Sequence, residues 1–261
     1  MTAVAVPVAE PGTLTVFGRA AAAEWLRLRT VRTTWWCLLA AAVTIVGIAA
    51  TAAFDMSQGS DGLASGEPVT IAGEFGVLLG QFALLVLALL AVTQEYASGS
   101  IGPTLQWTPR RGVLLAARVT VPVAVATGAG VLLALVADVA AWVIAPDLTL
   151  SFPDLADSLG RIAAVLVAGG VLAVGVGLLL RSTAGALATV FLLQLVLPFL
   201  LPAFGVAWMA DLGELLPGSG AIWTLLGEPD MSAARATALL VGWSGAALAA
   251  GGWSLLRRDA G

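Results

Sequence analysis

Residues 71–93, IAGEFGVLLGQFALLVLALLAVT, decide the fold class of this chain because they are almost entirely apolar and carry one charge, Glu74. A helix that crosses the hydrocarbon core of a bilayer needs about 20 such residues. Further segments of the same kind lie on both sides of this stretch. The sequence therefore predicts an all-α membrane protein with six transmembrane helices, at about 34–53, 71–93, 113–145, 159–180, 184–202 and 233–256.

The composition of the 261 residues agrees with this class, since 59% are hydrophobic and 11% are charged. Soluble domains contain about 45–50% apolar and about 25% charged residues. Six spans with short loops use most of the chain, so residues 34–256 are predicted to form a transmembrane domain with no sizeable soluble domain. A chain without a basic soluble domain is a poor candidate for binding nucleic acid.

The 12 cationic residues, all of them arginine, predict the orientation of the helices. Loops that stay in the cytoplasm collect Lys and Arg. With both termini in the cytoplasm, ten arginines share one membrane face: Arg19, Arg27, Arg29, Arg32, Arg110, Arg111, Arg118, Arg181, Arg257 and Arg258. Only Arg161 and Arg235 fall on the other face. Arginine without lysine in a chain rich in Ala, Gly and Val suggests a high-GC bacterium, so we expect a multi-pass protein of the bacterial cytoplasmic (inner) membrane.

The segment before the first span divides into two parts. Residues 1–14 are predicted to be a disordered tail, and residues 15–33 an amphipathic helix in the membrane interface. One face of this helix carries Trp25, Leu28 and Val31, and its polar side carries Arg27, Arg29 and Arg32 near anionic headgroups. The alternative is an ordinary solvated, positively charged flank of the first span.

Two further assignments concern the chain ends. A basic start, an apolar core and A-T-A-A before Phe54 also fit a signal peptide, but the segment is too long for one. Residues 257–261 are predicted to be a short cytoplasmic tail.

Three regions depart from simple spans. Residues 203–232 alternate apolar and turn-like pieces without a cation, which predicts short helices dipping into the outer interface. Residues 113–145 are too long for one straight crossing, and Pro122 favours a kink or a tilt. Gly169, Ala173 and Gly177 form a small-residue stripe that allows close helix contact, although Gly and Ala are common throughout the chain.

The segment 94–112, QEYASGSIGPTLQWTPRRG, is the longest loop predicted on the cytoplasmic side. Pro103 can open a helix because the first turn needs no amide donor. Leu105 and Trp107 then offer apolar surface before a pair of arginines. A short amphipathic helix exposed to the cytoplasm is suited to docking a partner protein. The alternative is a re-entry turn whose Trp107 is anchored at the interface.

Residue types that the chain lacks exclude several kinds of chemistry. There is no histidine, and the single cysteine, Cys37, lies in a predicted span, which excludes a His/Cys metal site. Ser-His and Cys-His catalysis within the chain are excluded as well. Because there is no lysine, the phosphate-binding loop G-x-x-x-x-G-K-[ST] is absent. The chain is therefore predicted to be no enzyme, to hold no cofactor or metal, and not to hydrolyse ATP by itself.

Polar side chains inside the predicted spans are candidates for a functional role: Asp138, Glu74 and Gln81. A buried acid in lipid is costly and is a functional candidate by default. One interpretation pairs Asp138 with Arg161 at the head of the fourth span. In the other, Asp138 reaches the outer water and Arg161 pairs with Asp157, one turn earlier.

Three stretches, taken together and in this order, resemble one family. They are EWLRLRTVRTTWWCLLAA at 24–41, TQEYASGSIGPTLQWTPRRGVLLAAR at 93–118 and LLLRSTAGALA at 178–188. They resemble the basic elbow helix, the E-Y-x-x-G-x-I-x-x-T-L…P-R-R stretch and the span four–five turn of the permease subunits of type-2 ABC exporters. The similarity is to the compact six-span permeases of actinobacteria and extends over essentially the whole chain.

This resemblance implies roles for particular segments. Residues 15–33 would be the elbow helix beside an ATPase subunit, and residues 97–109 would contain a coupling helix seated in a cleft of that subunit. The residues that it assigns to coupling are Glu95, Tyr96, Gly99, Ile101, Thr104, Leu105 and Trp107. Residues 204–230 would be partly re-entrant outer helices. The chain departs from the family at Gly102, where a polar or basic residue is common.

The function implied is that of a permease subunit of an ATP-driven ABC exporter, which forms the membrane pathway. Its implied partners are a separate ABC ATPase subunit that holds ATP and Mg, a second permease copy in a homo- or heterodimer, and membrane lipid. The alternative is a non-transporting polytopic membrane protein, such as a sensor or an assembly factor, which needs no ATPase. A membrane-embedded enzyme lacks evident chemistry in this sequence.

Overall fold

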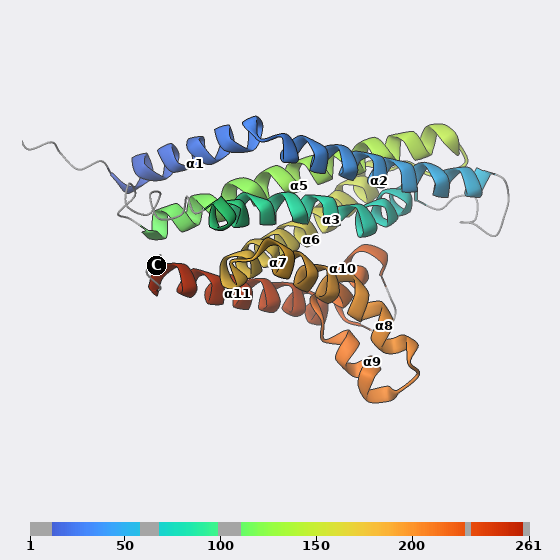
Figure 1. Ribbon diagram of the computed structural model, residues 1–261. Coiled ribbons are helices and arrows are strands. Elements are labelled where there is room, and N and C mark those ends of the chain that lie inside the picture. The colour runs from blue at the N-terminus through green and yellow to red at the C-terminus, as the bar shows by residue number, and fades with distance from the viewer. Residues whose placement is uncertain (1–11, 58–67, 99–110, 228–230, 258–261) are drawn as a thin grey trace, which may run out of the picture.

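The structure, a computed structural model, describes residues 12–57, 68–98, 111–227 and 231–257 (Figure 1). Its elements are α1 (Thr13–Thr30), α2 (Arg32–Ser57), α3 (Thr70–Ser98), α5 (Arg111–Ile144), α6 (Phe152–Leu180), α7 (Thr183–Phe191), the π-helical turn η1 (Leu192–Val196), α8 (Leu197–Ala203), α9 (Ala207–Glu214), α10 (Pro217–Leu226) and α11 (Ala233–Arg257). Within these ranges the only β-structure is an isolated bridge between Pro68 and Thr149.

Six helices of the described chain are long and apolar enough to cross a membrane, which confirms the predicted number of spans. They are Arg32–Ser57, Thr70–Tyr96, Arg111–Ile144, Phe152–Leu180, Thr183–Ala203 and Ala233–Leu255. The largest difference in a boundary is at α6, which begins at Phe152 instead of 159. The side chain of Ser151 caps it by accepting a hydrogen bond from the Asp154 amide, and a proline occupies its first turn.

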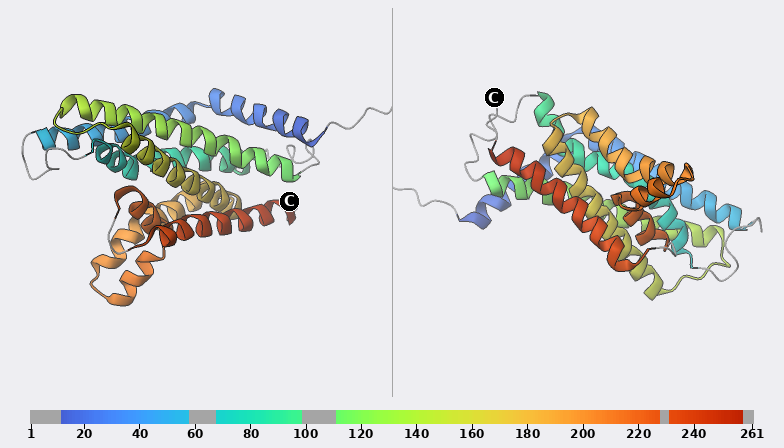
Figure 2. Two further views of the ribbon diagram at one scale, coloured as in Figure 1. Left: turned by 180° about the vertical axis from the view of Figure 1, so that it is seen from behind. Right: turned by 90° about the horizontal axis from the view of Figure 1, so that it is seen from below.

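Helix α3 is the centre of the bundle, because α2, α5, α6 and α7 all pack against it. Helix α11 lies along α6 on the other side (Figures 1 and 2). The start of α1 and the end of α11 lie at one end of the bundle, and α8, α9 and α10 gather toward the opposite end. We call these the inner and the outer end, following the predicted orientation.

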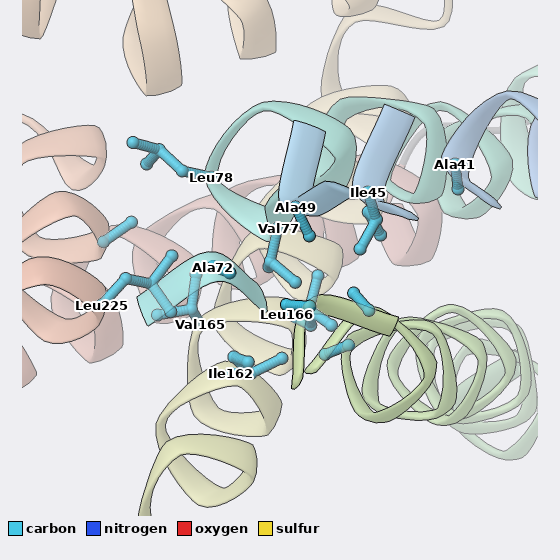
Figure 3. Close-up of a cluster of buried hydrophobic side chains, with 14 of the residues drawn as sticks. Ala41, Ile45, Ala49, Ala72, Val77, Leu78, Ile162, Val165, Leu166 and Leu225 are labelled. Carbon is cyan, nitrogen blue, oxygen red and sulfur yellow. The ribbon is translucent and has the colours of Figure 1, made fainter. Parts of the chain in front are cut away.

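Small residues on α3 allow α2 to approach it closely. A Cβ atom on Gly76 would collide with the backbone carbonyl of Ile45, and one on Gly80 would collide with the Ile45 side chain. Figure 3 shows Ile45 pointing into a buried apolar cluster that also contains Val77 and Leu166. The main contact of the first two spans is therefore decided by side-chain size.

The fifth span is irregular because of a proline. Pro198 has no amide hydrogen, so the carbonyl of Gln194 loses its usual donor four residues later. The preceding turn widens, and the amide of Leu197 bonds the carbonyl of Leu192 in a π-helical pattern. The helix continues as α8, and the segment after it forms α9 and α10. Short helices were predicted for 203–232, and they are present.

Helix α1 differs from the predicted interfacial helix in its bounds and in its packing. It begins at Thr13, inside the predicted tail 1–14, and ends at Thr30, since Val31 is extended at φ −83° and ψ 123°. The Thr30 hydroxyl competes for backbone carbonyls at this end by bonding those of Leu26 and Arg27. The main packing partner of α1 is the first half of α5. It lies alongside that helix and does not cross the end of the bundle (Figure 1).

Candidate functional site

The candidate site is at the inner end, where α3 leads into the segment predicted to couple to an ATPase. Glu95 and Tyr96 occupy the last turn of α3. The other residues predicted for coupling lie outside the described ranges: Gly99, Ile101, Thr104, Leu105 and Trp107. The geometry of the site is therefore that of the base of this segment.

The carboxylate of Glu95 lies between two guanidinium groups from different helices. Its Oε1 accepts a hydrogen bond from Arg27 of α1, and its Oε2 accepts one from Arg118 of α5. Glu24 of α1 completes the group, with its Oε2 2.5 Å from Arg27 Nη2 and its Oε1 3.5 Å from Arg118 Nε. We call Glu24, Arg27, Glu95 and Arg118 the inner charge cluster. It joins α1, α3 and α5.

Burial makes the inner charge cluster sensitive to the loss of any member. The side chain of Arg118 is 1% exposed, that of Glu24 8% and that of Glu95 14%. Burial raises the pKa of Glu24, and the nearby guanidinium groups of Arg27 and Arg118 oppose this shift. Each described carboxylate of the cluster lies beside a guanidinium group, so the removal of one member leaves a buried charge less well compensated.

Tyr96, the next residue along the chain, makes contacts on the other side of α3. The guanidinium carbon of Arg181 lies 5.4 Å from the centre of the Tyr96 ring, within the range of a cation–π contact. Arg181 ends α6 in the left-handed conformation, with φ 52°, and its Nη2 donates to the carbonyl of Ser254 in α11 at 3.0 Å. Glu95 and Tyr96 therefore connect the base of the predicted coupling segment to both sides of the bundle.

The structure corrects the predicted positions of Arg27 and Trp25 on α1. Arg27 points into the bundle beside the buried Leu28, although the sequence placed it with the headgroup-facing arginines. Trp25 is 48% exposed and lies 6.0 Å from the guanidinium of Arg29, so it does not share the buried face with Leu28. The reason is that Arg27 pairs with the largely buried Glu95 of α3. A helical wheel of α1 alone cannot show a partner from another helix. Arg32 is the first residue of α2.

Sequence reasoning named only part of the inner charge cluster. Glu24 was missed, although it stands three residues before Arg27, a spacing that favours a pair on one helix face. Arg118 was counted with the cytoplasmic arginines, yet it lies inside the predicted span 113–145. An arginine within a span was the available signal for a buried partner.

A second group of ion pairs lies at the outer end. Arg161 of α6 pairs with Glu74 of α3 at 2.6 Å and with Asp157 of its own helix at 3.2 Å. Its Nη1 also donates to the carbonyl of Leu225 at the end of α10, at 3.4 Å. The predicted pair of Arg161 with Asp157 is confirmed, and Glu74 is an additional partner from a distant part of the chain. Arg161 holds α3, α6 and α10 together.

Asp138 has a different position from the two predicted for it. It is fully buried, so it does not reach water, and its described hydrogen bond is to the backbone of α3 instead of to Arg161. Its Oδ1 accepts from the amide of Gly73 at 3.1 Å. Gly73 lies in the first turn of α3, where amides have no partner within the helix. Asp138 thus caps α3 from α5, and a Cβ atom on Gly73 would collide with its carboxylate.

Gln81 is also buried, at 1% exposure. Its Nε2 donates to the carbonyl of Leu78 in its own helix at 2.9 Å. This bond supplies one partner of a costly buried amide without help from another helix. Among the described residues, no group of three or more His, Cys, Asp or Glu side chains could hold a metal ion.

No protein-family model matches this chain, and no curated protein matches it.

Proposed function

We propose that this chain is the permease subunit of an ATP-driven exporter, which forms a membrane pathway and couples to a separate ATPase subunit. Two features support the proposal. The chain is a polytopic membrane protein with six candidate spans. Its segment 93–118 resembles the coupling region of type-2 ABC permeases, and the inner charge cluster lies at the base of that segment.

The observation that carries the proposal is the position of Glu95. It stands in the last turn of α3, and it binds α1 through Arg27 and α5 through Arg118. A force applied to the segment 97–109 would reach these helices through charges that are costly to separate when buried. Tyr96 would pass the same displacement to α6 through Arg181.

The mechanism that follows uses ATP outside this chain. Binding of ATP and Mg would close a dimer of ATPase subunits and move the coupling segment of each permease chain. The rigid connection at Glu95 and Tyr96 would turn this movement into a tilt of the spans on both sides of α3. A second permease copy, identical or related, would complete the path around a two-fold axis.

Purification of the tagged chain from membranes of its host tests this function directly. We expect an ATPase subunit to co-purify, and its hydrolysis of ATP to require this chain. The double substitution Leu105→Asp and Trp107→Asp should uncouple hydrolysis from transport. Gln106→Asp is the matched control, because it adds a charge to the same segment without removing an apolar side chain.

The alternative, a sensor or an assembly factor without an ATPase, makes the opposite prediction. The chain would then be isolated in its functional form with no ATP-hydrolysing partner.

Unchanged transport with a normally bound ATPase in the Leu105 and Trp107 variant would reject the assigned coupling segment.

A further inference from the structure

A cleft of about 310 Å³ lies at the outer end, between α8, α9 and α10. Its lining includes Phe199, Glu214, Ser219, Ile222, Trp223 and Met231. Ligand pockets for small molecules have volumes of about 300–1,000 Å³ and combine apolar walls with a few polar groups. The cleft has both properties and is separate from the inner charge cluster.

Hydrogen bonds between the surrounding elements hold this cleft in shape. Ser219 of α10 donates to the carbonyl of Gly213 in α9 at 2.7 Å. Trp243 of α11 donates through Nε1 to the carbonyl of Leu215, between α9 and α10, at 2.8 Å. A Cβ atom on Gly213 would lie 3.2 Å from Pro202 of α8, so the absence of a side chain there keeps α8 and α9 close. The walls are thus formed before any ligand enters.

Among the described residues of the lining, Glu214 carries a charge, and its ion pair leaves its carboxylate accessible to a ligand. Its carboxylate lies 2.9 Å from Arg235 of α11, with both side chains about half exposed, at 44% and 40%. Exposed pairs of this kind contribute little stability, because water screens both charges. A cationic ligand could therefore replace the Arg235 guanidinium at small cost.

We propose that this outer cleft binds a small hydrophobic organic cation. Its charged nitrogen occupies the place of Arg235 beside Glu214, and its apolar body lies against Phe199, Ile222 and Trp223. The aromatic rings add a cation–π contribution where the charge approaches their faces. Charge complementarity selects a cation over a neutral lipid chain or a neutral solute of the same shape.

This inference does not depend on the proposed function. The cleft is formed by one chain and lies at the outer end, whereas Glu95 and Tyr96, the described residues assigned to coupling, lie at the inner end. Binding can therefore be measured on the purified chain without an ATPase partner, and failure of either proposal leaves the other standing.

The test is a fluorescence titration of the full chain in nanodiscs of phosphatidylcholine, with empty nanodiscs as the blank. The probe is dansylcadaverine, a primary amine with an apolar fluorophore, and the matched control ligand is its N-acetyl derivative, which has no charge. We expect the amine to bind about fivefold more tightly than the acetylated compound. Glu214→Gln should remove this preference by raising the Kd of the amine about fivefold.

Two further variants distinguish a bound cation from other causes. Arg235→Gln breaks the same ion pair as Glu214→Gln but removes the competitor, so it should lower the Kd of the amine. Asp211→Asn removes an acid from the same helix that does not line the cleft, and it should leave the Kd unchanged. Equal binding of the two ligands, no binding above the blank, weaker binding to Arg235→Gln, or equal effects of Asp211→Asn and Glu214→Gln would each overturn the proposal.

Discussion

Arg118 is the residue on which the inner end depends most, because its charge is almost completely buried. It bonds Glu95 and faces Glu24, so it neutralises acids from two other helices. A charge in such a position is favourable only while its partners remain. The residue is therefore a sensitive probe of whether α1, α3 and α5 form one unit.

We predict that Arg118→Met lowers the free energy of unfolding by about 3–5 kcal/mol, since it leaves the two largely buried carboxylates of Glu24 and Glu95 with Arg27 as their one described arginine partner. Thermal or denaturant unfolding in detergent measures this. Arg29→Met is the matched control, because Arg29 is exposed on α1, and its unfolding midpoint should stay close to that of the unsubstituted chain. Equal effects of the two variants would contradict the role of the cluster.

Asp138 shows how an acid inside a span can have a structural role. Its side-chain oxygen lies at the N-terminus of α3, where the amides of the first turn need acceptors from outside the helix. Asp138 thus has a structural role in capping a helix end, and its presence inside a span does not require an ion pathway.

We predict that Asp138→Ala costs about 1–3 kcal/mol of folding free energy, because it leaves the Gly73 amide buried without an acceptor. Asp138→Asn should cost less, since its side-chain oxygen still accepts that hydrogen bond. Unfolding curves of both variants decide the order. If Asp138→Asn lost as much folding free energy as Asp138→Ala, the charge of Asp138 and not its hydrogen-bond acceptor would explain the stabilisation.

At the level of elements, glycines let α6 and α11 approach closely. A Cβ atom on Gly175 would lie 2.5 Å from the backbone of Ala247, and one on Gly251 would lie 2.3 Å from the carbonyl oxygen of Gly175. The stripe that includes Gly169 faces α3 instead, where a Cβ atom would lie 3.0 Å from Leu85. Helix α6 therefore uses small residues on two faces to hold two neighbours.

We predict that Gly175→Ala destabilises the bundle by about 1–3 kcal/mol, because backbone atoms of α11 must move to admit the methyl group. Gly128→Ala in α5 is the control. Apart from the backbone of its own helix, no described atom lies within 4 Å of its added methyl group, and alanine favours a helix over glycine. Unfolding midpoints compare the two, and a similar loss in both would show that α6 and α11 are not in close contact.

The length of α5 also has an explanation at the level of elements. Its 34 residues span about 51 Å, longer than the hydrocarbon core of about 30 Å. Helix α1 packs against α5, and Val121 and Val125 of α5 pack against the apolar cluster that contains Leu28 of α1. Part of the extra length therefore supports α1, while the helix runs through Pro122 without a break.

For the whole molecule, we predict that both termini and the segments 94–112 and 181–183 are cytoplasmic. In a Cys37→Ala background, cysteines placed at positions 60 and 150 should react with a membrane-impermeant thiol reagent in intact cells. A cysteine at position 98 should react only after permeabilisation. Labelling at 98 from outside would reverse the predicted orientation.

We also predict that the purified chain alone neither binds nor hydrolyses ATP, and that the active complex contains at least two permease chains. The chain has no lysine to reach the β- and γ-phosphates, and six helices enclose little pathway by themselves. Mass measurement of the active complex in detergent counts the chains. One permease chain supporting ATP turnover stimulated by cargo would contradict this stoichiometry.

Much of the architecture was predictable because the bilayer imposes a local rule. Every span must pair its backbone hydrogen-bonding groups within one helix and place about 20 apolar residues in the hydrocarbon core. Each span can therefore be recognised from its own segment of sequence. The same holds for the interruption at 203–232. The start of α6 at Phe152 was missed, although its cap at Ser151 and the proline after it are neighbours in the sequence.

The partners of the polar residues were decided only by the tertiary structure. Arg27 and Glu95 are 68 positions apart, and Gly73 and Asp138 are 65 positions apart. Nothing in either segment alone states which helix will be its neighbour, since that choice depends on how small residues such as Gly76 and Gly175 let helices approach. The sequence by itself determined that the chain crosses the membrane and where, because hydrophobic transfer acts on each segment separately. Which charges meet, and which acid caps a helix, was settled by the packing of the bundle, because an ion pair or a hydrogen bond requires its two groups to be adjacent in space.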